Sequence, residues 1–329
     1  GIGSDAVGVS VIQDMGTNSS ISGNEFNGVL SSAVGEKIGI RVGSGEDRKT
    51  DATYAVYHEG DMLGSINNNV FAAGFKVGSG DYQGMLIDGN MAAGSTLKGN
   101  KIQYGIQSST ETYGIKVTGG LLENDGALAA ATINNNTFNE INAVSTNGSN
   151  AYGIKANSMA TGSSISANIF EAITSSTSAN AGAIGIKVVA DMSGIIGCAS
   201  GETDTTVCGN NFKMISSESS SAVGIEVQST GAEAVISGNQ IKVNSGMKSG
   251  GSKGIRVVEI RSDQSNQIHN NTITLESSGK GIHIDSIILT RSFAFNIITD
   301  NKVSLPSAPE TYGINFDGGI VMTQGDFRG

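Results

Sequence analysis

An asparagine recurs through this chain inside one short motif, and its spacing constrains the fold more than any other feature. The motif reads apolar-x-x-Asn-x-apolar, and nine copies follow one another. Its asparagines are Asn24, Asn69, Asn100, Asn136, Asn168, Asn210, Asn239, Asn271 and Asn301. Successive asparagines are 29 to 45 residues apart. Repeats of this length are typical of solenoids, in which each repeat packs only on its neighbours.

A second motif, Gly-apolar-x-apolar, alternates with the first. Its glycines are Gly8, Gly39, Gly84, Gly114, Gly153, Gly185, Gly224, Gly254, Gly281 and Gly313. Both motifs alternate apolar and polar residues over four to six positions, which is the periodicity of a β-strand. The Ser, Thr, Asn and Gly tracts between them are typical of turns. In the sixth copy of the Asn motif, this spacing makes Val207 the first apolar residue.

These motifs predict an all-β fold, a single-stranded right-handed parallel β-helix of nine to ten coils that forms one domain over residues 1–329. Coils stack about 4.8 Å apart, so one asparagine per coil forms a ladder. Each side-chain amide then donates to the next asparagine and accepts from the previous one. The right hand follows from the general preference of strand crossovers. The repeated glycine marks a positive-φ bend or a close approach of backbone between coils.

Two longer connections, about 43–64 and 190–208, are predicted to be insertion loops. The first holds a cluster of charges with Tyr54 and Tyr57, and we expect these tyrosines to contact a partner surface. The second ends with Cys208, ten positions after Cys198. A disulfide between these cysteines is one prediction, and two free thiols are the alternative. The disulfide would suit an oxidising compartment.

Composition excludes several function classes. Net charge is −10, and the Lys and Arg residues are scattered singly, which argues against a nucleic-acid partner. The chain has no apolar run long enough to span a membrane, and no spacing of metal ligands or cofactor motif stands out. It starts at Gly1 without a signal-peptide pattern, so we expect a processed or excised piece of a longer protein.

One wall of the predicted rod carries a file of basic residues. The position two residues after the repeat glycine is a lysine in three successive coils, at Lys116, Lys155 and Lys187. Such a stripe fits contact with an anionic glycan or a neighbouring acidic surface. A solvated wall without a partner is the alternative.

Two carboxylates near the end of the chain are the candidates for catalysis. Asp285 and Asp317 fall at equivalent places in adjacent coils, and His283 lies on the same strand as Asp285. Glycoside hydrolysis uses a carboxylate pair about 5 to 9 Å apart. However, no Arg is expected in register beside the pair, and His58 and His269 are predicted to be isolated surface residues. The sequence therefore favours a protein that is not an enzyme, with polysaccharide cleavage as an alternative.

With its I-x-x-N-x-F and G-I-x-V coils, scarce cysteine and acidic balance, the chain resembles the passenger region of a bacterial autotransporter or a related β-helical surface adhesin. A phage tailspike fragment shares the same wall chemistry. The resemblance implies an extracellular or cell-surface rod that contacts a protein or glycan of a host or neighbouring cell. Because the first and last strand motifs lie close to the termini, a subunit that associates head to tail into a filament is a further alternative.

Overall fold

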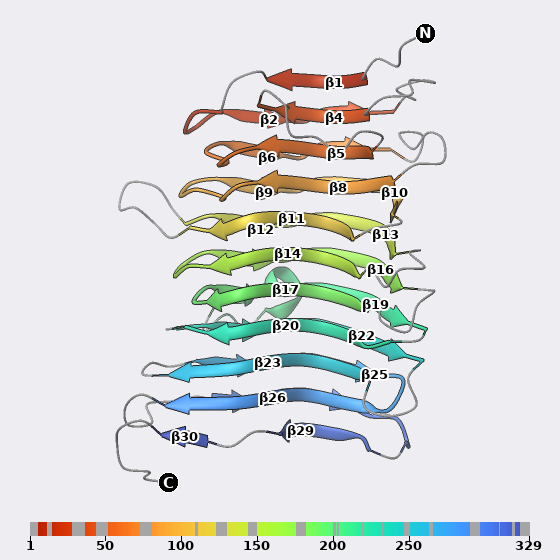
Figure 1. The fold of residues 1–329 in the computed structure, drawn as a ribbon, viewed down its shortest axis with the longest axis vertical. Helices are drawn as coiled ribbons and strands as arrows, with labels where there is room; N and C mark the ends of the chain where they lie inside the picture. The colour runs from red at the N-terminus through yellow and green to blue at the C-terminus, as the bar shows by residue number, and fades with distance from the viewer. Residues whose placement is uncertain are drawn as a thin grey trace.

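The structure is a computed structural model of the chain. It describes residues 6–11, 15–27, 37–43, 52–72, 81–108, 111–122, 130–143, 150–175, 182–199, 202, 204–218, 220–231, 233–246, 251–262, 266–289, 297–308, 310–317 and 320–322. The described chain forms a rod of stacked coils, with β1 and β30 at opposite ends (Figure 1). Strands of successive coils pair in parallel, so the predicted parallel β-helix is confirmed.

Each regular coil contributes three strands, one to each of three parallel sheets. Sheet 1 holds the Gly motifs and consists of β1 (Ala6–Val11), β4 (Lys37–Val42), β5 (Ala52–Glu59), β8 (Asp81–Asp88), β11 (Thr112–Leu121), β14 (Ala151–Met159), β17 (Ala183–Met192), β20 (Ala222–Thr230), β23 (Ser252–Ser262), β26 (Gly279–Leu289), β29 (Tyr312–Phe316) and β30 (Ile320–Met322). The Asn motif is split between the other two sheets, so a repeat unit has three strands rather than the two that the motifs indicate.

Sheet 2 takes the first half of each Asn motif, and sheet 3 takes the second half. Sheet 2 consists of β2 (Ser20–Ser22), β6 (Ser65–Asn67), β9 (Thr96–Lys98), β12 (Thr132–Asn134), β15 (Ser164–Ser166), β18 (Ile195–Gly197), β21 (Val235–Ser237), β24 (Gln267–His269) and β27 (Ile297–Thr299). Sheet 3 consists of β3 (Glu25–Phe26), β7 (Val70–Phe71), β10 (Lys101–Ser108), β13 (Thr137–Ala143), β16 (Ile169–Ser175), β19 (Asn211–Ser217), β22 (Gln240–Ser245), β25 (Thr272–Leu275) and β28 (Lys302–Ser304).

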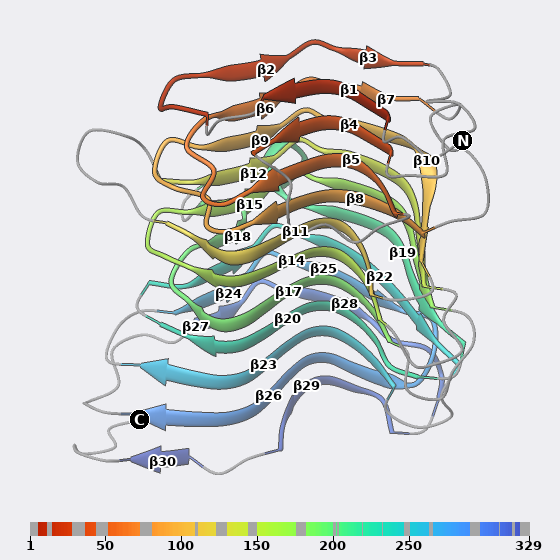
Figure 2. The same cartoon turned by 45° about the horizontal axis from the view of Figure 1, so that its top comes forward.

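The coil is right-handed, as predicted. In Figure 1 the strands of sheet 1 run to the left at the front and those of sheet 3 run to the right behind them, while the chain descends from the N-terminus. Figure 2, tilted by 45°, shows the same course from above. Sheets 1 and 3 join at one antiparallel bridge between β8 and β10.

The asparagines form a continuous ladder at the bend between sheets 2 and 3. The amide nitrogen Nδ2 of Asn136 donates to Oδ1 of Asn168 at 3.0 Å, and Asn168 donates in the same way to Asn210. The backbone N–H of each ladder residue donates to the same Oδ1 of the next coil, at 3.0 to 3.2 Å between Asn100 and Asn239. The second Nδ2 proton bonds a carbonyl oxygen of the preceding coil, such as Ile133 O. Every polar group of a buried asparagine is therefore satisfied.

The residue before each ladder asparagine explains the three asparagines of the INNN run. In eight coils it has a positive φ, and these residues are Gly23, Asn68, Gly99, Asn135, Ala167, Gly238, Asn270 and Asp300. Asn135, at a φ of 56°, makes the exposed left-handed turn that sets Asn136 at the corner. Asparagine and glycine tolerate this backbone region better than other residues.

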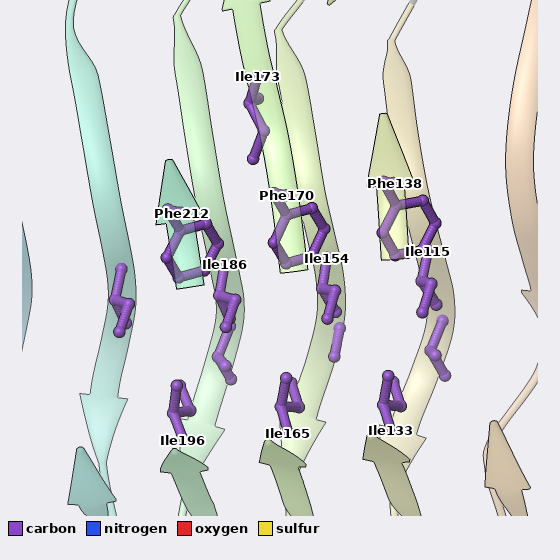
Figure 3. Packing of buried hydrophobic residues seen from close by; sticks show 14 of the residues in the cluster. Ile115, Ile133, Phe138, Ile154, Ile165, Phe170, Ile173, Ile186, Ile196 and Phe212 are labelled. Carbon is purple, nitrogen blue, oxygen red and sulfur yellow. The ribbon is translucent and has the colours of Figure 1, made fainter. Parts of the chain in front are cut away.

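The core consists of vertical files of identical or similar side chains. Phe138, Phe170 and Phe212 stack with their ring centroids 5.0 to 5.1 Å apart and nearly parallel. Figure 3 shows this file beside the files of aliphatic residues from sheets 1 and 2. Burial of each large apolar side chain contributes about 1.5 to 3 kcal/mol, and the same gain recurs in coil after coil.

The repeat glycines are required because backbone and aromatic side chains approach them closely. A Cβ atom on Gly185 would lie 2.3 Å from Gly224 O and 2.8 Å from Cε1 of Phe212. None of the ten repeat glycines has a positive φ, so the predicted close approach is confirmed, and a left-handed bend at the glycine is wrong. Figure 2 shows the bend of the sheet 1 strands across their middle.

The predicted insertion loop at 43–64 is largely wrong. Residues 52–59 form β5, which pairs with β4 and β8 as an extra strand of sheet 1. The sequence hides this strand because Ala55 stands where the repeat glycine is expected. Tyr104, from a bulge in β10, fills the core beside the extra strand, and its hydroxyl donates to Gln83 O at 2.9 Å. Residues 44–51 lie outside the described chain.

The second predicted insertion begins later than position 190. Residues 183–192 and 195–197 belong to β17 and β18, and the inserted segment starts at Cys198. Ile196 occupies the core place that the motif spacing assigns to Val207, which lies in the one-turn helix α1 (Thr205–Cys208) with 67% of its surface exposed. Figure 3 shows Ile196 in file with Ile133 and Ile165.

A disulfide joins Cys198 to Cys208 at the base of this segment, with their Cα atoms 4.9 Å apart. The Cys198 N–H donates to Ser237 O of the next coil, and Cys208 O accepts from Ala167 N of the preceding coil. In the regular coil of Asn135, two adjacent residues make the equivalent bonds. The insertion therefore opens the tight turn before Asn210, and the disulfide closes it again.

Candidate functional site

The outer wall of sheet 1 carries the longest arrangement of charged side chains in the described chain. Strand pairing places one residue of each coil in a single file along the rod. From the N-terminal side, this file runs Ser10, Arg41, Tyr57, Leu86, Lys116, Lys155, Lys187, Glu226, Arg256, His283 and Asn315. We call it the wall file. Its C-terminal half contains the predicted carboxylate site.

Acidic side chains pair with the three predicted lysines of the wall file. Glu111 bridges two of them, with carboxylate oxygens 2.7 Å from Lys116 Nζ and 2.5 Å from Lys155 Nζ. Lys187 pairs with Glu226 at 2.8 Å. Burial raises the pKa of Glu111, but the two lysines outweigh burial and hold the pKa below its usual value. The three lysines therefore lie in one file as predicted and are paired with carboxylates, and their contact with an anionic partner stays a prediction.

Tyrosine rings lie under two of these lysines. Lys116 Nζ lies 5.4 Å from the ring centroid of Tyr113, and Lys155 Nζ lies 4.8 Å from that of Tyr152. Tyr113 and Tyr152 pack with two aliphatic residues of the next coils into a cluster that is at least 95% buried. These cation–π contacts order the lysine side chains further.

Tyr54 and Tyr57 do not form the predicted contact surface. Both lie on β5, with relative exposures of 3% and 2%. Their rings pack edge to face, with centroids 5.6 Å apart, beside Ile38. The expected loop at this place suggests a partner site for the two tyrosines. The segment is instead a strand of sheet 1, and both rings pack against neighbouring residues of that sheet.

At the C-terminal end, the structure brings His283, Asp285 and Asp317 together. His283 Nε2 lies 2.9 Å from Asp285 Oδ1 and 3.0 Å from Asp317 Oδ2. The distance between these two carboxylate oxygens therefore cannot exceed the sum of the two contact distances. The imidazole is 5% exposed, and its Nδ1 is buried without a hydrogen-bond partner. A neutral ring with its proton on Nε2 satisfies this geometry.

Electrostatics agree with a neutral imidazole. Burial lowers the pKa of His283, and the neighbouring Lys280 lowers it further, against the opposing effect of Asp285 and Asp317. Protonation would also place a second N–H at the buried Nδ1, where it has no acceptor. His283 therefore acts as a hydrogen-bond donor between two carboxylates of adjacent coils.

Each carboxylate also binds a cation that sequence reasoning missed. Arg256 donates from Nη2 at 2.6 Å and from Nε at 3.2 Å to Asp285 Oδ2, and its Nη1 lies 3.4 Å from Glu226. Lys280 Nζ lies 2.6 Å from Asp317 Oδ2. The expectation that no Arg stands in register is wrong, because Arg256 pairs directly with His283 across β23 and β26. Arg256 and His283 each stand two positions after a repeat glycine in successive coils, and this spacing could have revealed their pairing.

The chemistry of this cluster differs from that of a hydrolase pair. A glycosidase needs one carboxylic acid with a raised pKa to protonate the leaving oxygen. Hydrogen bonds from Lys280 and Asn315 instead lower the pKa of Asp317 to about 2. Asp285 accepts from both Arg256 and His283. Asp317 is therefore held as an anion, and both carboxylates accept hydrogen bonds that link neighbouring coils.

The other two histidines lie elsewhere. His58 is fully buried on β5, in register with Val42 and Ile87, so its predicted place on the surface is wrong. His269 lies half-buried on the outer face of sheet 2. Burial lowers the pKa of His269. Neither joins the cluster around His283.

Comparison with known proteins gives no relative: no protein-family model, no curated protein and no solved structure matches this chain. No helix of the described residues has the length and apolarity to cross a bilayer. Within the same residues, no group of three or more His, Cys, Asp or Glu side chains could hold a metal ion.

Proposed function

We propose that this protein is an extracellular β-helical rod that serves structure and adhesion rather than catalysis. The observation that carries the proposal is the set of ion pairs on the sheet 1 wall, which links neighbouring coils in two groups. Glu111 joins Lys116 to Lys155, and a second group runs from Lys187 through Glu226 and Arg256 to Asp285 and, by way of His283, to Asp317. Together with the asparagine ladder inside, these ion pairs connect neighbouring coils. A stiff rod with a wall of ion-paired side chains suits contact over a distance.

The disulfide supports an oxidising location. Disulfides persist outside the cytosol and are rare inside it. Cys198 and Cys208 are the two cysteines of the chain, and they are bonded to each other. On this basis we place the rod outside the cell or on its surface, with a protein or glycan of another surface as its partner.

Two measurements test this proposal. Purified protein is incubated with neutral and acidic polysaccharides, and newly formed reducing ends and unsaturated products are quantified. We expect none, and no difference from an Asp285→Asn/Asp317→Asn variant. Turnover that this variant loses would overturn the non-catalytic part. In the second measurement, protein-coated beads are held against cell- and glycan-coated surfaces under flow, and the absence of retention on every surface would overturn the adhesive part.

A filament subunit is a second candidate, favoured by the C-terminal coil. Ile314 and Phe316 are 48% and 54% exposed, whereas their register partners Ile282 and Ile284 are at most 1% exposed. Stacking of another molecule would bury these side chains. Light scattering across a concentration series tests this candidate: fibres that Ile314→Lys abolishes would favour it, with Ile169→Lys on the sheet 3 wall as the control.

A further inference from the structure

A groove crosses four coils on the outer side of sheet 2, where the chain enters this sheet from sheet 1. Its volume is about 340 Å³. Residues that line it are Thr161, Ser193, Ile195, Glu233, Val235 and Gln267. This volume lies at the lower end of the range of about 300 to 1,000 Å³ that small-molecule sites occupy. The groove is separate from the wall file of sheet 1.

The floor of the groove interrupts a regular file of hydroxyl side chains. Register pairing places one outward residue of each sheet 2 strand in line, and the first five are Ser20, Ser65, Thr96, Thr132 and Ser164. The next two are Ile195 and Val235, before Gln267 follows. The change to branched aliphatic side chains coincides with the groove. Ile195 is half-buried and Val235 is 7% exposed, so Ile195 provides most of the apolar surface that a ligand could cover here.

The rim contains a carboxylate at an unusual backbone position. Glu233 has a φ of 61° two residues before its sheet 2 strand, where equivalent turns have Asn18, Gly94 and Gly162. Glutamate is disfavoured in this left-handed region, in which glycine is free of strain. In the described chain the carboxylate forms no ion pair or hydrogen bond. A strained residue without a structural contact points to a role toward a ligand.

We propose that this groove binds a neutral saccharide. A sugar ring presents an apolar C–H face, which fits the Ile195 and Val235 floor, and hydroxyl groups around its edge. The Glu233 carboxylate accepts hydrogen bonds from vicinal hydroxyls, while Ser193 and Thr161 can donate and accept. The negative charge of Glu233, and the absence of any Lys, Arg or His among the lining residues that the structure describes, disfavour an anionic sugar.

This inference goes beyond the proposed rod function, because it assigns a ligand class to one place on the wall. The test begins with a printed array of neutral, sialylated and uronic-acid glycans probed with labelled full-length protein. The best-bound glycan is then titrated by calorimetry against the parent and its variants. We expect binding to neutral glycans and an affinity loss of about tenfold or more in Glu233→Gly, since hydrogen bonds to charged groups have this weight.

The repeats of the chain provide matched variants that keep the fold. Glu233→Gly restores the residue of the equivalent turns, so it is expected to keep or raise the melting temperature while it weakens binding. Ile195→Ser installs the residue found at Ser65 and Ser164 at the half-buried position of the floor, so it is expected to weaken binding severalfold. Asn18→Gly makes the same turn change outside the groove and is expected to leave binding unchanged.

Binding to neutral glycans that both groove variants weaken, with Asn18→Gly unaffected, supports the proposal. No binding to any glycan, binding to acidic glycans alone, or binding that Glu233→Gly and Ile195→Ser leave unchanged would overturn it. Failure of the proposed rod function and failure of this binding site give different results. Polysaccharide turnover would contradict the non-catalytic rod, but it would not change the affinities measured for the groove variants.

Discussion

Removal of one amide from the middle of the asparagine ladder is expected to cost far more than removal of an amide from the surface. In Asn168→Ala, Nδ2 and the backbone N–H of Asn136 both lose their acceptor, Asn168 Oδ1. Ile133 O and Asn210 Oδ1 each lose a donor. All three ladder residues are fully buried, so water cannot replace these bonds.

The expected magnitude follows from these lost partners. A buried polar group left without a partner costs about 1 to 3 kcal/mol, and two donors are orphaned outright. With the weakened acceptors, Asn168→Ala is expected to lower the free energy of unfolding by about 4 kcal/mol. The matched control is Asn139→Ala, because Asn139 is exposed and makes one side-chain bond, to Gln103 O at 2.9 Å. Its expected loss is about 0.5 kcal/mol.

Urea unfolding followed by far-ultraviolet circular dichroism measures both variants and the parent. A difference between Asn168→Ala and Asn139→Ala below about 1 kcal/mol would refute the reasoning, because one unsatisfied buried group already costs that much. An Asn168→Asp variant adds a second check. Aspartate can still accept from Asn136, but as an anion it cannot donate to Ile133 O, so it is expected to destabilise as well.

Three further predictions concern other parts of the rod. Gly185→Ala is expected to lose about 3 kcal/mol in the same urea assay because its Cβ meets Gly224 O and Phe212, whereas Gly313→Ala, with no atom within 4 Å, is expected to be neutral; equal effects would contradict the close-approach account. The pKa of His283 is lowered in the fold, so the unfolded chain binds more protons below pH 6.5 and stability falls on acidification by at most about 1.4 kcal/mol per pH unit. Melting temperatures are measured from pH 8 to 5 in two proteins that both carry His269→Gln, one with and one without His283→Gln. The slope of melting temperature against pH is expected to be shallower in the protein with His283→Gln, and identical slopes would contradict the buried neutral imidazole. A Cys198→Ala/Cys208→Ala variant is expected to lose roughly 2 to 3 kcal/mol from the freed loop, and reducing agent should lower the stability of the parent alone; an unchanged variant would contradict the role of the disulfide.

The sequence was sufficient for the stacking of the coils because the same side chains recur at the places where coils touch. The Asn136 amide must meet another amide, and the bare Cα of Gly185 must receive a carbonyl and a phenyl ring. Repetition makes such requirements visible. The ladder and the Gly strands could therefore be predicted, although the bend at each asparagine, which divides its motif between two sheets, could not.

The errors arise where one copy departs from the repeat. Ala55 replaces the repeat glycine, so the repeat pattern predicts a loop where β5 lies and a contact surface where its tyrosines are buried. The insertion after Cys198 separates Ile196 from Asn210, so spacing pointed to Val207. Departures of this kind are invisible to a periodic pattern, and the three-dimensional pairing is needed to align them.

The candidate site was predicted in part. The proximity of Asp285, Asp317 and His283 follows from register alone, and register also places Arg256 beside them. The bridging of two lysines by Glu111 could not be predicted, because it depends on a side chain outside the Gly motif that reaches two coils. Ion pairs of this kind depend on side-chain geometry, on which the repeat has no bearing.

Spin-label distances along sheet 2 test the central claim, that successive coils stack in register, most directly. Ser22, Lys98 and His269 lie on the same outward file of sheet 2. Because coils are about 4.8 Å apart, labels at Lys98 and His269, five coils apart, are expected at about 24 Å, and labels at Ser22 and His269, seven coils apart, at about 34 Å. Pulsed electron–electron double resonance should give two narrow distance distributions whose centres differ by about 10 Å. Distances that do not grow with the number of intervening coils would contradict the stacked rod and its ladder.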